Sequence, residues 1–339
     1  MTASPCLVTG AAGWLGSRLV ELLGQAGVGP LRCFVRPGQA AVVRGYAPEA
    51  EIVEGDLADS GDCERFFSDA RDGILYHCSG LIHPSRVCEY YEVNVRAAAN
   101  ALAAASRARV RRAVVVSSNS PLGCNPHPDH QFDEDSPYNP CGHYGRSKML
   151  MELEAQKFHQ RGQVESVIIR APWFYGPNQP PRQSEFFRMI RAGKAPIVGD
   201  GKNFRSMAYI DNLCQGLRLA AQTKLAAGKI YWIADERPYA WNEIIDTVAA
   251  LLRDEFGLPA SGRRTRLPGF AGELALGADK LIQALGFYNQ KIHVLSECNK
   301  TIVCSINRAK QELGYRPEVD LREGMRRSIA WCLQRGIEI

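Results

Sequence analysis

Three polar side chains in the sequence have the types and the spacing of an acid/base catalyst. Tyr144 and Lys148 lie four residues apart in HYGRSKMLMELE, at the start of an expected helix, so both side chains emerge on one helix face. A phenol has an unperturbed pKa of about 10, and an adjacent ammonium group favours the phenolate and lowers that pKa. Ser118 follows the apolar run Ala113 to Ser117, which predicts a strand ending where ligands bind in parallel sheets. We therefore expect Tyr144 to transfer a proton while the Ser118 hydroxyl holds a substrate oxygen.

A glycine-punctuated turn near the N-terminus predicts a nucleotide site that would position a cofactor beside these residues. In CLVTGAAGWLG, Gly10, Gly13 and Gly16 follow a short apolar run and precede leucines at helical spacing. Glycine at each position lets the backbone turn tightly and approach a pyrophosphate, which the amides at the helix N-terminus can bind. The alternative is an ordinary strand-to-helix turn. The Tyr-x-x-x-Lys pair and the Ser-Ser strand end in the same chain favour the cofactor interpretation.

Two charged residues bear on which dinucleotide is bound. Arg36 ends the second apolar run in FVRPG, where an acidic residue would favour NAD, and a guanidinium there can pair with a 2′-phosphate. We therefore expect NADP, with NAD possible; the alternatives are that Arg36 stacks on the adenine or is a solvated loop residue. Asp56 in EGDLAD could accept a hydrogen bond from the adenine amino group, or it could be the N-cap of the helix that carries Phe66 and Phe67.

At this point the chain resembles the extended short-chain dehydrogenase/reductase family, which also contains nucleotide-sugar epimerases and dehydratases. The resemblance covers nearly the whole length. It rests on these motifs: TGAAGWLG, GDL, HCSG, YYEVNV, VVVSS, YGRSK, RAPWFYGP, VGDGKNFRSMAYIDN, LGYRP and LREGMRRSIAW.

The resemblance implies roles for particular residues. It makes Tyr144 the acid/base, Ser118 and Lys148 its partners, and Asn94 part of a proton relay, although Asn94 considered alone would be a helix-surface residue. Lys148 would also bind the nicotinamide ribose. The predicted cofactor contacts are Gly10, Ala12, Gly13, Trp14, Leu15, Gly16, Arg36, Asp56, Leu57, Cys78, Ser79, Gly80, Tyr144, Lys148, Pro172 and Trp173. The predicted substrate contacts are Ser118, Asn119, Phe174, Tyr175 and Arg205.

The alternation of β-rich runs with helical patterns predicts an α/β fold: a Rossmann-type doubly wound parallel sheet with a smaller C-terminal α/β substrate-binding lobe. We expect residues 1–172 and 206–235 to form the NADP-binding domain, and residues 173–205 and 236–339 to form mainly the substrate lobe. The predicted strands are Cys6 to Thr9, Leu31 to Val35, Glu51 to Val53, Ile74 to His77, Ala113 to Ser117 and Val167 to Arg170.

The second lobe gives mixed indications of the substrate. Nucleotide-sugar members of the family carry an Arg-Asp pair where this chain has Arg205 and Ser206, and an Arg-Pro-Gly-Asp run that this chain lacks. A Pro-led helix between Arg263 and Tyr288 looks like the sterol and 3β-hydroxysteroid dehydrogenase branch, where a comparable helix covers an apolar substrate. The alternative is ordinary core packing. The apolar face of this expected helix contains Leu274, Leu276, Leu281, Ile282 and Leu285.

These observations predict an NADP-dependent oxidoreductase that moves hydride between nicotinamide and a secondary alcohol or ketone. The alternative is a nucleotide-sugar epimerase, dehydratase or 4-ketoreductase of the same family. Dehydratases of the family typically have Thr-Asp-Glu where this chain has Ser118, Asn119 and Ser120, which disfavours that activity. A non-catalytic, cofactor-sensing member is a third hypothesis, and the intact Ser-Tyr-Lys set argues against it.

The composition of the chain indicates which classes of partner and which compartment to expect. A formal charge of +5, from 41 basic and 36 acidic residues, does not indicate nucleic-acid binding. Eleven scattered cysteines without a C-x-x-C pair indicate reduced thiols of a cytoplasmic protein, and we predict no metal site. We see no signal peptide and no membrane span. A small-molecule substrate and a homodimer are expected, with the helices containing Asn94 and Ala97 to Ala105, and Tyr144 to His159, packing against their mates.

Overall fold

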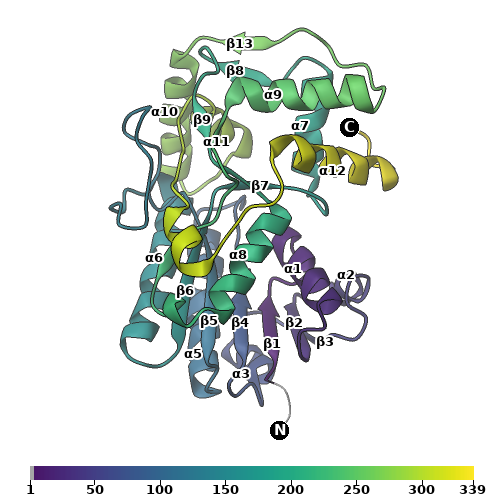
Figure 1. Cartoon of the computed structure of the whole chain (residues 1–339). Helices are drawn as coiled ribbons and strands as arrows, with labels where there is room; N and C mark the ends of the chain where they lie inside the picture. The colour runs from purple at the N-terminus through teal and green to yellow at the C-terminus, as the bar shows by residue number, and fades with distance from the viewer. Residues whose placement is uncertain (1–3) are drawn as a thin grey trace.

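The computed structural model of the protein describes residues 4–339. Within these residues, seven parallel strands form the main sheet in the order β11-β6-β5-β4-β1-β2-β3. Figure 1 shows this sheet in the lower part of the molecule. The strands are β1 (Cys6–Thr9), β2 (Leu31–Val35), β3 (Glu51–Glu54), β4 (Ile74–His77), β5 (Arg112–Ser118), β6 (Glu165–Ala171) and β11 (Ile230–Trp232).

The predicted doubly wound sheet is confirmed, and the six predicted strands differ from the observed ones by at most two residues at either end. Of the seven strands of the main sheet, the one that we did not predict is β11, which pairs with β6 through Ile230 and Ile168 at the edge of the sheet. It has only three residues, too few to show a period of two.

Alternate residues of the central strands enter separate apolar cores on the two faces of the sheet, as the pleat of a strand requires. Val8 belongs to the core that contains α1 (Trp14–Gln25) and α8 (Ile210–Gln222). Leu7 belongs to the core that contains α3 (Ser60–Phe67), α5 (Ala97–Arg107) and α6 (Gly142–Gln160). Both faces of the sheet are therefore covered by helices, which explains the continuous apolar runs of its strands.

The strand order reverses between β1 and β4, since β1 pairs with β2 on one side and β4 on the other. Ligands of doubly wound sheets bind in the crevice at such a point, outside the carboxyl ends of the strands. Gly10 follows β1 and Cys78 follows β4, so both lie at this crevice.

Most of the remaining chain forms a second group of elements, in the upper part of Figure 1. Its three small sheets pair β7 (Trp173–Tyr175) with β10 (Met207–Tyr209), β9 (Phe204–Arg205) with β12 (Tyr239–Ala240), and β8 (Pro196–Val198) with β13 (Thr265–Leu267). Its helices are α7 (Pro181–Arg191), α9 (Trp241–Ala250), α10 (Phe270–Ala284), α11 (Gln290–Glu297) and α12 (Leu321–Gln334). The predicted residue boundaries between the two lobes stay a prediction.

Short elements complete the fold. They are α2 (Ala40–Arg44), α4 (Cys88–Tyr90), the 3-10 turn η2 (Lys224–Ala226), and the π-helical segments η1 (Tyr91–Arg96), η3 (Leu251–Glu255) and η4 (Ala309–Leu313). Among residues 4–339, no helix combines the length and the apolar character that crossing a membrane requires. All eleven cysteines lie in this part of the chain and are unpaired.

Candidate active site

The turn after β1 has a shape that only glycine permits. Gly10 has a positive φ of 68°, and a Cβ atom there would lie 2.8 Å from the carbonyl carbon of Cys78 and from the amide nitrogen of Ser79. A Cβ atom on Gly16 would lie 2.0 Å from the Gly10 carbonyl oxygen. Helix α1 therefore begins directly against the backbone that follows β1 and β4. Its N-cap is Gly13, which provides no side-chain cap, so the first amides of the helix are left for an external anion.

The residues expected near the adenosine ribose lie on the surface. Arg36 is exposed directly after β2. The Glu54 carboxylate, at the end of the neighbouring strand β3, accepts a hydrogen bond from the Gly38 amide at 3.0 Å. The sequence interpretation missed this carboxylate because it considered only the end of the second strand.

Asp56 is exposed, and its Oδ1 accepts a hydrogen bond from the Ala58 amide at 2.9 Å. The alternative role proposed for Asp56, N-cap of the following helix, is wrong. Asp59 caps α3, because its carboxylate accepts from the Asp62 amide at 2.9 Å. Two aspartates three residues apart precede this helix, and their sequence does not distinguish the cap from the turn residue.

Trp14 links the predicted cofactor turn to the second group of elements. Its indole Nε1 donates to the Pro177 carbonyl at 2.7 Å, and its ring lies 4.7 Å from that of Phe174. Trp173, also predicted at the cofactor, donates from Nε1 to Gln183 Oε1 at 3.3 Å and packs against Phe186. The remaining predicted cofactor contacts follow carboxyl ends of strands of the main sheet, in the turn after β1, in the segments after β3 and β4, and after β6: Ala12, Leu15, Leu57, Ser79, Gly80 and Pro172.

Tyr144 and Ser118 lie together at the carboxyl end of β5. Burial raises the pKa of the Tyr144 phenol to about 12, while a hydrogen bond with Ser118 and the charge of Arg182 act in the opposite direction. The Ser118 hydroxyl also lies 3.3 Å from Ser120 Oγ and 3.4 Å from Asn119 Oδ1. The phenol is thus protonated at neutral pH in the protein alone and needs further positive charge to act as a base.

Lys148 lies one helical turn after Tyr144 and is directed at the sheet. Its ammonium group donates to the Val116 carbonyl at 2.7 Å. Burial lowers the pKa of Lys148 to about 8, opposed by the negative charge of Glu152. A Cβ atom on Gly80 would lie 3.7 Å from Lys148 Nζ, which places the ammonium beside the segment that follows β4.

Asn94 is fully buried in the wide π-helical turn η1 and does not lie on the helix surface. Its side-chain oxygen accepts from the Leu81 amide at 2.7 Å, and its Nδ2 donates to the Leu81 carbonyl and to Ser147 Oγ, each at 3.0 Å. Asn94 therefore ties the segment after β4 to α6, the helix that carries Tyr144. An inserted π-turn of this kind is frequent at functional sites.

A buried ion pair between Glu152 and Arg170 joins α6 to the main sheet. The Glu152 carboxylate accepts from Arg170 at 2.8 Å, from the Tyr138 hydroxyl at 2.8 Å and from the Ser117 hydroxyl at 2.5 Å. Glu152 and Arg170 have almost no exposed side-chain area. The network fixes α6 against β5 and β6, one turn beyond Lys148.

The structure adds polar residues around Tyr144 that the sequence interpretation missed. His83 Nδ1 lies 2.8 Å from the Tyr288 hydroxyl, and the Tyr90 ring lies 5.7 Å from the Tyr144 ring and 5.8 Å from the Tyr288 ring. Arg182, in the first turn of α7, is close enough for its charge to lower the pKa of Tyr144 and, after burial, that of His83. These residues come from three distant stretches, and no local motif marks them.

A second group of polar side chains lines the inner side of α10 and α11. His293 Nδ1 lies 2.8 Å from Asp279 Oδ2, and its ring centre lies 5.4 Å from that of Tyr288. Burial acts to lower the pKa of His293, but the hydrogen bond with Asp279 and the charge of Glu297 raise it above its ordinary value. Gln283 donates to Asp279 at 2.7 Å and accepts from the His143 amide at 3.0 Å, which connects α10 to the start of α6.

Helix α10 therefore has the opposite orientation to the one expected for a cover over an apolar substrate. Its buried residues are Gly272, Ala275, Asp279 and Gln283. Leu274, Leu281 and Leu285, which we expected either to cover a substrate or to pack in the core, are exposed, and Leu276 and Ile282 are half-buried. An apolar stripe shows that a helix has two unlike faces, but not which of them faces the protein.

Two of the predicted substrate residues, Tyr175 and Arg205, are buried among other side chains. Tyr175 is fully buried and donates its hydroxyl proton to Asp235 Oδ2 at 2.7 Å. Arg205 is nearly buried, donates to the Glu297 carbonyl, and lies 5.9 Å from the Trp241 ring centre. Its Nε has no hydrogen-bond partner in residues 4–339. The structure does not bring either residue to Tyr144.

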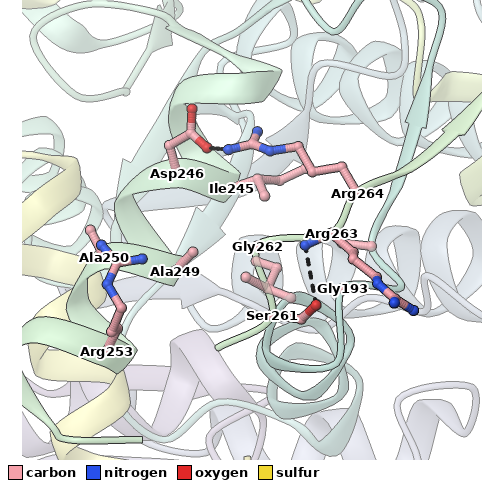
Figure 2. Close-up of a pocket in the computed structure, with 12 residues that line it drawn as sticks. Gly193, Ile245, Asp246, Ala249, Ala250, Arg253, Ser261, Gly262, Arg263 and Arg264 are labelled. Atoms are coloured by element: carbon pink, nitrogen blue, oxygen red, sulfur yellow. Dashed lines mark hydrogen bonds and ion pairs between the residues drawn. The ribbon is translucent and has the colours of Figure 1, made fainter. Parts of the chain in front are cut away.

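A cavity of about 300 Å³ lies apart from these residues, between α7, α9 and the segment 261–264. Figure 2 shows Arg263, Arg264 and Asp246 at its rim, with Arg264 directed at the Asp246 carboxylate. None of the predicted catalytic, cofactor or substrate residues lines it. Within residues 4–339, no three His, Cys, Asp or Glu side chains are grouped to hold a metal ion.

The fold and the glycine turn define a dinucleotide-dependent α/β enzyme. A profile of the NAD dependent epimerase/dehydratase family matches residues 6–234. The protein belongs to this family, an extended branch of the short-chain dehydrogenases/reductases, and the resemblance described from the sequence is confirmed.

Curated relatives match along almost the whole chain. An uncharacterised protein, y4nL of Sinorhizobium fredii, is 48% identical over 99% of this chain and 97% of its own. A 3beta-hydroxysteroid-dehydrogenase/decarboxylase of Arabidopsis thaliana is 27% identical over 96% of this chain and 78% of its own. A dTDP-glucose 4,6-dehydratase of Streptomyces griseus is 27% identical over 96% and 93%.

Among solved structures, the fold is similar to UDP-glucuronic acid 4-epimerase from Bacillus cereus, crystallised in complex with NAD. The two chains superpose with a TM-score of 0.77 over 98% of this chain and 99% of the epimerase, at 21% sequence identity. At this identity the likeness supports the fold alone.

Proposed function

We propose that the protein acts on a nucleotide sugar as an epimerase or 4-ketoreductase, using a nicotinamide dinucleotide and Tyr144 as acid/base. The observation that carries this proposal is the polar surroundings of Tyr144, where Arg182, His83, Tyr288 and the inner side of α10 replace the apolar cover that a sterol requires. A sugar hydroxyl can form hydrogen bonds with such groups, whereas the hydrocarbon rings of a sterol cannot.

The cofactor assignment is supported by the turn that a Cβ atom would fill at Gly10 and Gly16. Gly13 and the first amides of α1 would hold the pyrophosphate, and Lys148 and Gly80 lie where the nicotinamide ribose would sit. When bound, the dinucleotide supplies an acceptor for a hydride from the substrate carbon.

The catalytic steps assigned to the chain concern the proton and the substrate oxygen. Ser118 donates a hydrogen bond to the hydroxyl or carbonyl oxygen, and Tyr144 removes or returns the proton on that oxygen. Lys148, one helical turn from Tyr144, contributes positive charge to the site; its position is fixed by the Val116 carbonyl, and the charge of Glu152 favours its protonated form. Asn94 positions α6 relative to the segment after β4.

The test combines one variant with one ligand panel. Tyr144→Phe is expected to fold and bind dinucleotide with wild-type affinity while losing at least about two orders of magnitude in kcat. In thermal melting, UDP- and dTDP-linked sugars are expected to raise the Tm, whereas 3-ketosteroids are not. Wild-type turnover in Tyr144→Phe would refute the mechanism.

A sterol or other secondary-alcohol oxidoreductase is the second candidate, favoured by the similarity to the Arabidopsis dehydrogenase/decarboxylase. The same ligand panel distinguishes the two candidate functions, because ketosteroids should raise the Tm in the presence of dinucleotide only if the protein is a sterol oxidoreductase.

For the choice between NADP and NAD, we propose that exposed Arg36 binds the 2′-phosphate of NADP. The Glu54 carboxylate accepts a hydrogen bond from the amide of Gly38, which lies on the same loop as Arg36. Its negative charge would repel a 2′-phosphate and so opposes a preference for NADP. In Arg36→Ala, NADP affinity is expected to fall about tenfold to hundredfold with NAD affinity unchanged. An equal fall for both dinucleotides would instead assign Arg36 to adenine stacking.

We further propose a cytoplasmic homodimer with a cofactor domain of residues 1–172 and 206–235 and a substrate lobe formed mainly by residues 173–205 and 236–339. The unpaired cysteines support a reducing compartment. Most alanines of α5 pack on the sheet of their own chain, so Leu150 and Leu153, half-buried on α6, are the better support for a dimer. Light scattering that returned the mass of one 37.4 kDa chain at micromolar concentration would refute it.

A further inference from the structure

The outer side of α10 is an apolar surface of unusual exposure. Five large side chains on α10 and the turn after it have 60 to 68% of their area exposed. We call them the docking face: Phe270, Leu274, Leu281, Leu285 and Phe287. At 100° per residue, the three on the helix and Leu285 at its C-cap fall within an arc of about 60°, opposite the buried residues Asp279 and Gln283.

This arrangement is the inverse of an ordinary surface helix, which buries its apolar stripe. Helix α10 cannot rotate to bury the docking face, because Gln283 bonds to the His143 amide and Asp279 bonds to His293 on its inner side. The fold therefore holds the leucines outward. Figure 1 shows α10 on the periphery of the upper part of the molecule.

Cations border the docking face. Lys280 precedes Leu281 on the same helix, Lys291 lies in the first turn of α11, and both are exposed. Arg86 forms a β-bridge with Phe287. Of the two carboxylates on α10, Asp279 is buried on the inner side and Glu273 is paired with Lys300.

We propose that the docking face binds the surface of an anionic lipid bilayer, with α10 lying in the headgroup region. A helix with Phe and Leu on one side and Lys at its borders has the composition of such interfacial helices, whose apolar side enters about 5 to 10 Å of the membrane. Anionic lipid attracts the bordering cations.

The bilayer is favoured over a second copy of the chain on two grounds. Five side chains expose on the order of a few hundred Å², less than the roughly 800 Å² that each partner buries in a stable dimer. A symmetric pair would also bring the cations that border one docking face, Lys280 and Lys291, toward those that border the other, where like charges repel.

Bilayer binding has a consequence for substrate entry. The helix that exposes the docking face also holds Asp279 against His293, whose ring lies beside that of Tyr288 in the polar surroundings of Tyr144. A bilayer-bound molecule would therefore hold these polar residues within one helix diameter of the headgroups, about 10 Å. The proposal itself does not depend on the substrate assigned above.

The test is co-sedimentation with vesicles, which needs no turnover. Wild-type protein is expected to sediment with vesicles of equal phosphatidylcholine and phosphatidylglycerol, less at 0.5 M than at 0.05 M NaCl, and weakly with phosphatidylcholine alone. The double variant Leu281→Gln/Leu285→Gln is expected to bind at least about tenfold more weakly. Lys280→Glu/Lys291→Glu is expected to remove the preference for phosphatidylglycerol.

The matched control is Leu225→Gln, which changes a leucine that is 56% exposed in η2, outside α10. It is expected to bind as wild type, and unchanged thermal melting and dinucleotide affinity check the folding of all variants. The proposal is overturned if wild-type protein does not sediment, or if Leu281→Gln/Leu285→Gln sediments as wild type. It is equally overturned if light scattering shows a wild-type dimer that this variant abolishes without any vesicle binding, since the face would then join two copies.

Discussion

Helices α6 and α10 both bury polar side chains near Tyr144, yet they differ in where their large apolar side chains lie. Lys148 and Glu152 of α6 bond to the strands of the main sheet, through the Val116 carbonyl and Arg170. Asp279 and Gln283 of α10 bond to a histidine and to a helix start. Apolar residues of α6 also lie in the core, whereas the large apolar residues of α10 lie outside. Orientation in both helices follows the hydrogen-bond partners of the buried polar groups, because leaving such groups unpaired is costly.

The largest expected difference between the helices concerns charge. Glu152→Gln leaves the buried Arg170 guanidinium without its counter-ion, and we expect a loss of about 3 to 5 kcal/mol in the free energy of unfolding, measured by urea denaturation. The matched control is Glu154→Gln, two residues on, where the pair with Lys157 is partly exposed. It is expected to cost less than about 1 kcal/mol. Equal costs would remove the special role of the buried pair.

The next effect concerns packing on the inner side of α6. Met151 is fully buried between α6 and the sheet. Met151→Ala is expected to lower the free energy of unfolding by about 2 to 5 kcal/mol, through lost apolar burial and the cavity left behind. Urea denaturation measures this, and a loss below about 1 kcal/mol would mean that the helix is loosely packed.

A smaller effect, dependent on pH, is expected on the inner side of α10. The pKa of His293 is raised in the folded protein, so its stabilising contribution is complete below the unfolded value of about 6.5 and disappears as the pH rises through the folded pKa. His293→Gln should therefore cost about 1.5 kcal/mol at pH 5.5 and less at pH 8.5. A cost that grows with pH would contradict the charged pair with Asp279.

The smallest effect belongs to the outer side of α10. Leu285→Ala removes a side chain that is 68% exposed and is expected to change the free energy of unfolding by no more than about 0.5 kcal/mol. The same urea denaturation is measured at several protein concentrations. A loss of 2 kcal/mol, or a dependence on concentration, would show that another chain covers this side in solution.

The sequence predicted those parts of the site whose geometry is contained in a short segment. The glycine turn follows from three residues that must lack a Cβ atom, and the Tyr144–Lys148 pair follows from helical spacing. Arg182, His83 and Tyr288 could not be found in this way, because they meet only after α7, the segment after β4 and the α10–α11 turn have packed together. The direction of α10 was equally hidden, since it depends on what Asp279 and Gln283 bond to.

The π-helical turn η1 has a consequence for changes in chain length. Its six residues, Tyr91–Arg96, complete a turn that is wider than an α-helical one, and Asn94 points inward because of it. Deleting one residue there would remove the extra residue of the turn and with it the inward position of Asn94, whereas inserting one would rotate the preceding side chains by about 100° relative to the residues that follow. Insertions and deletions in this stretch should therefore be far less tolerated than substitutions, although most of its side chains reach solvent.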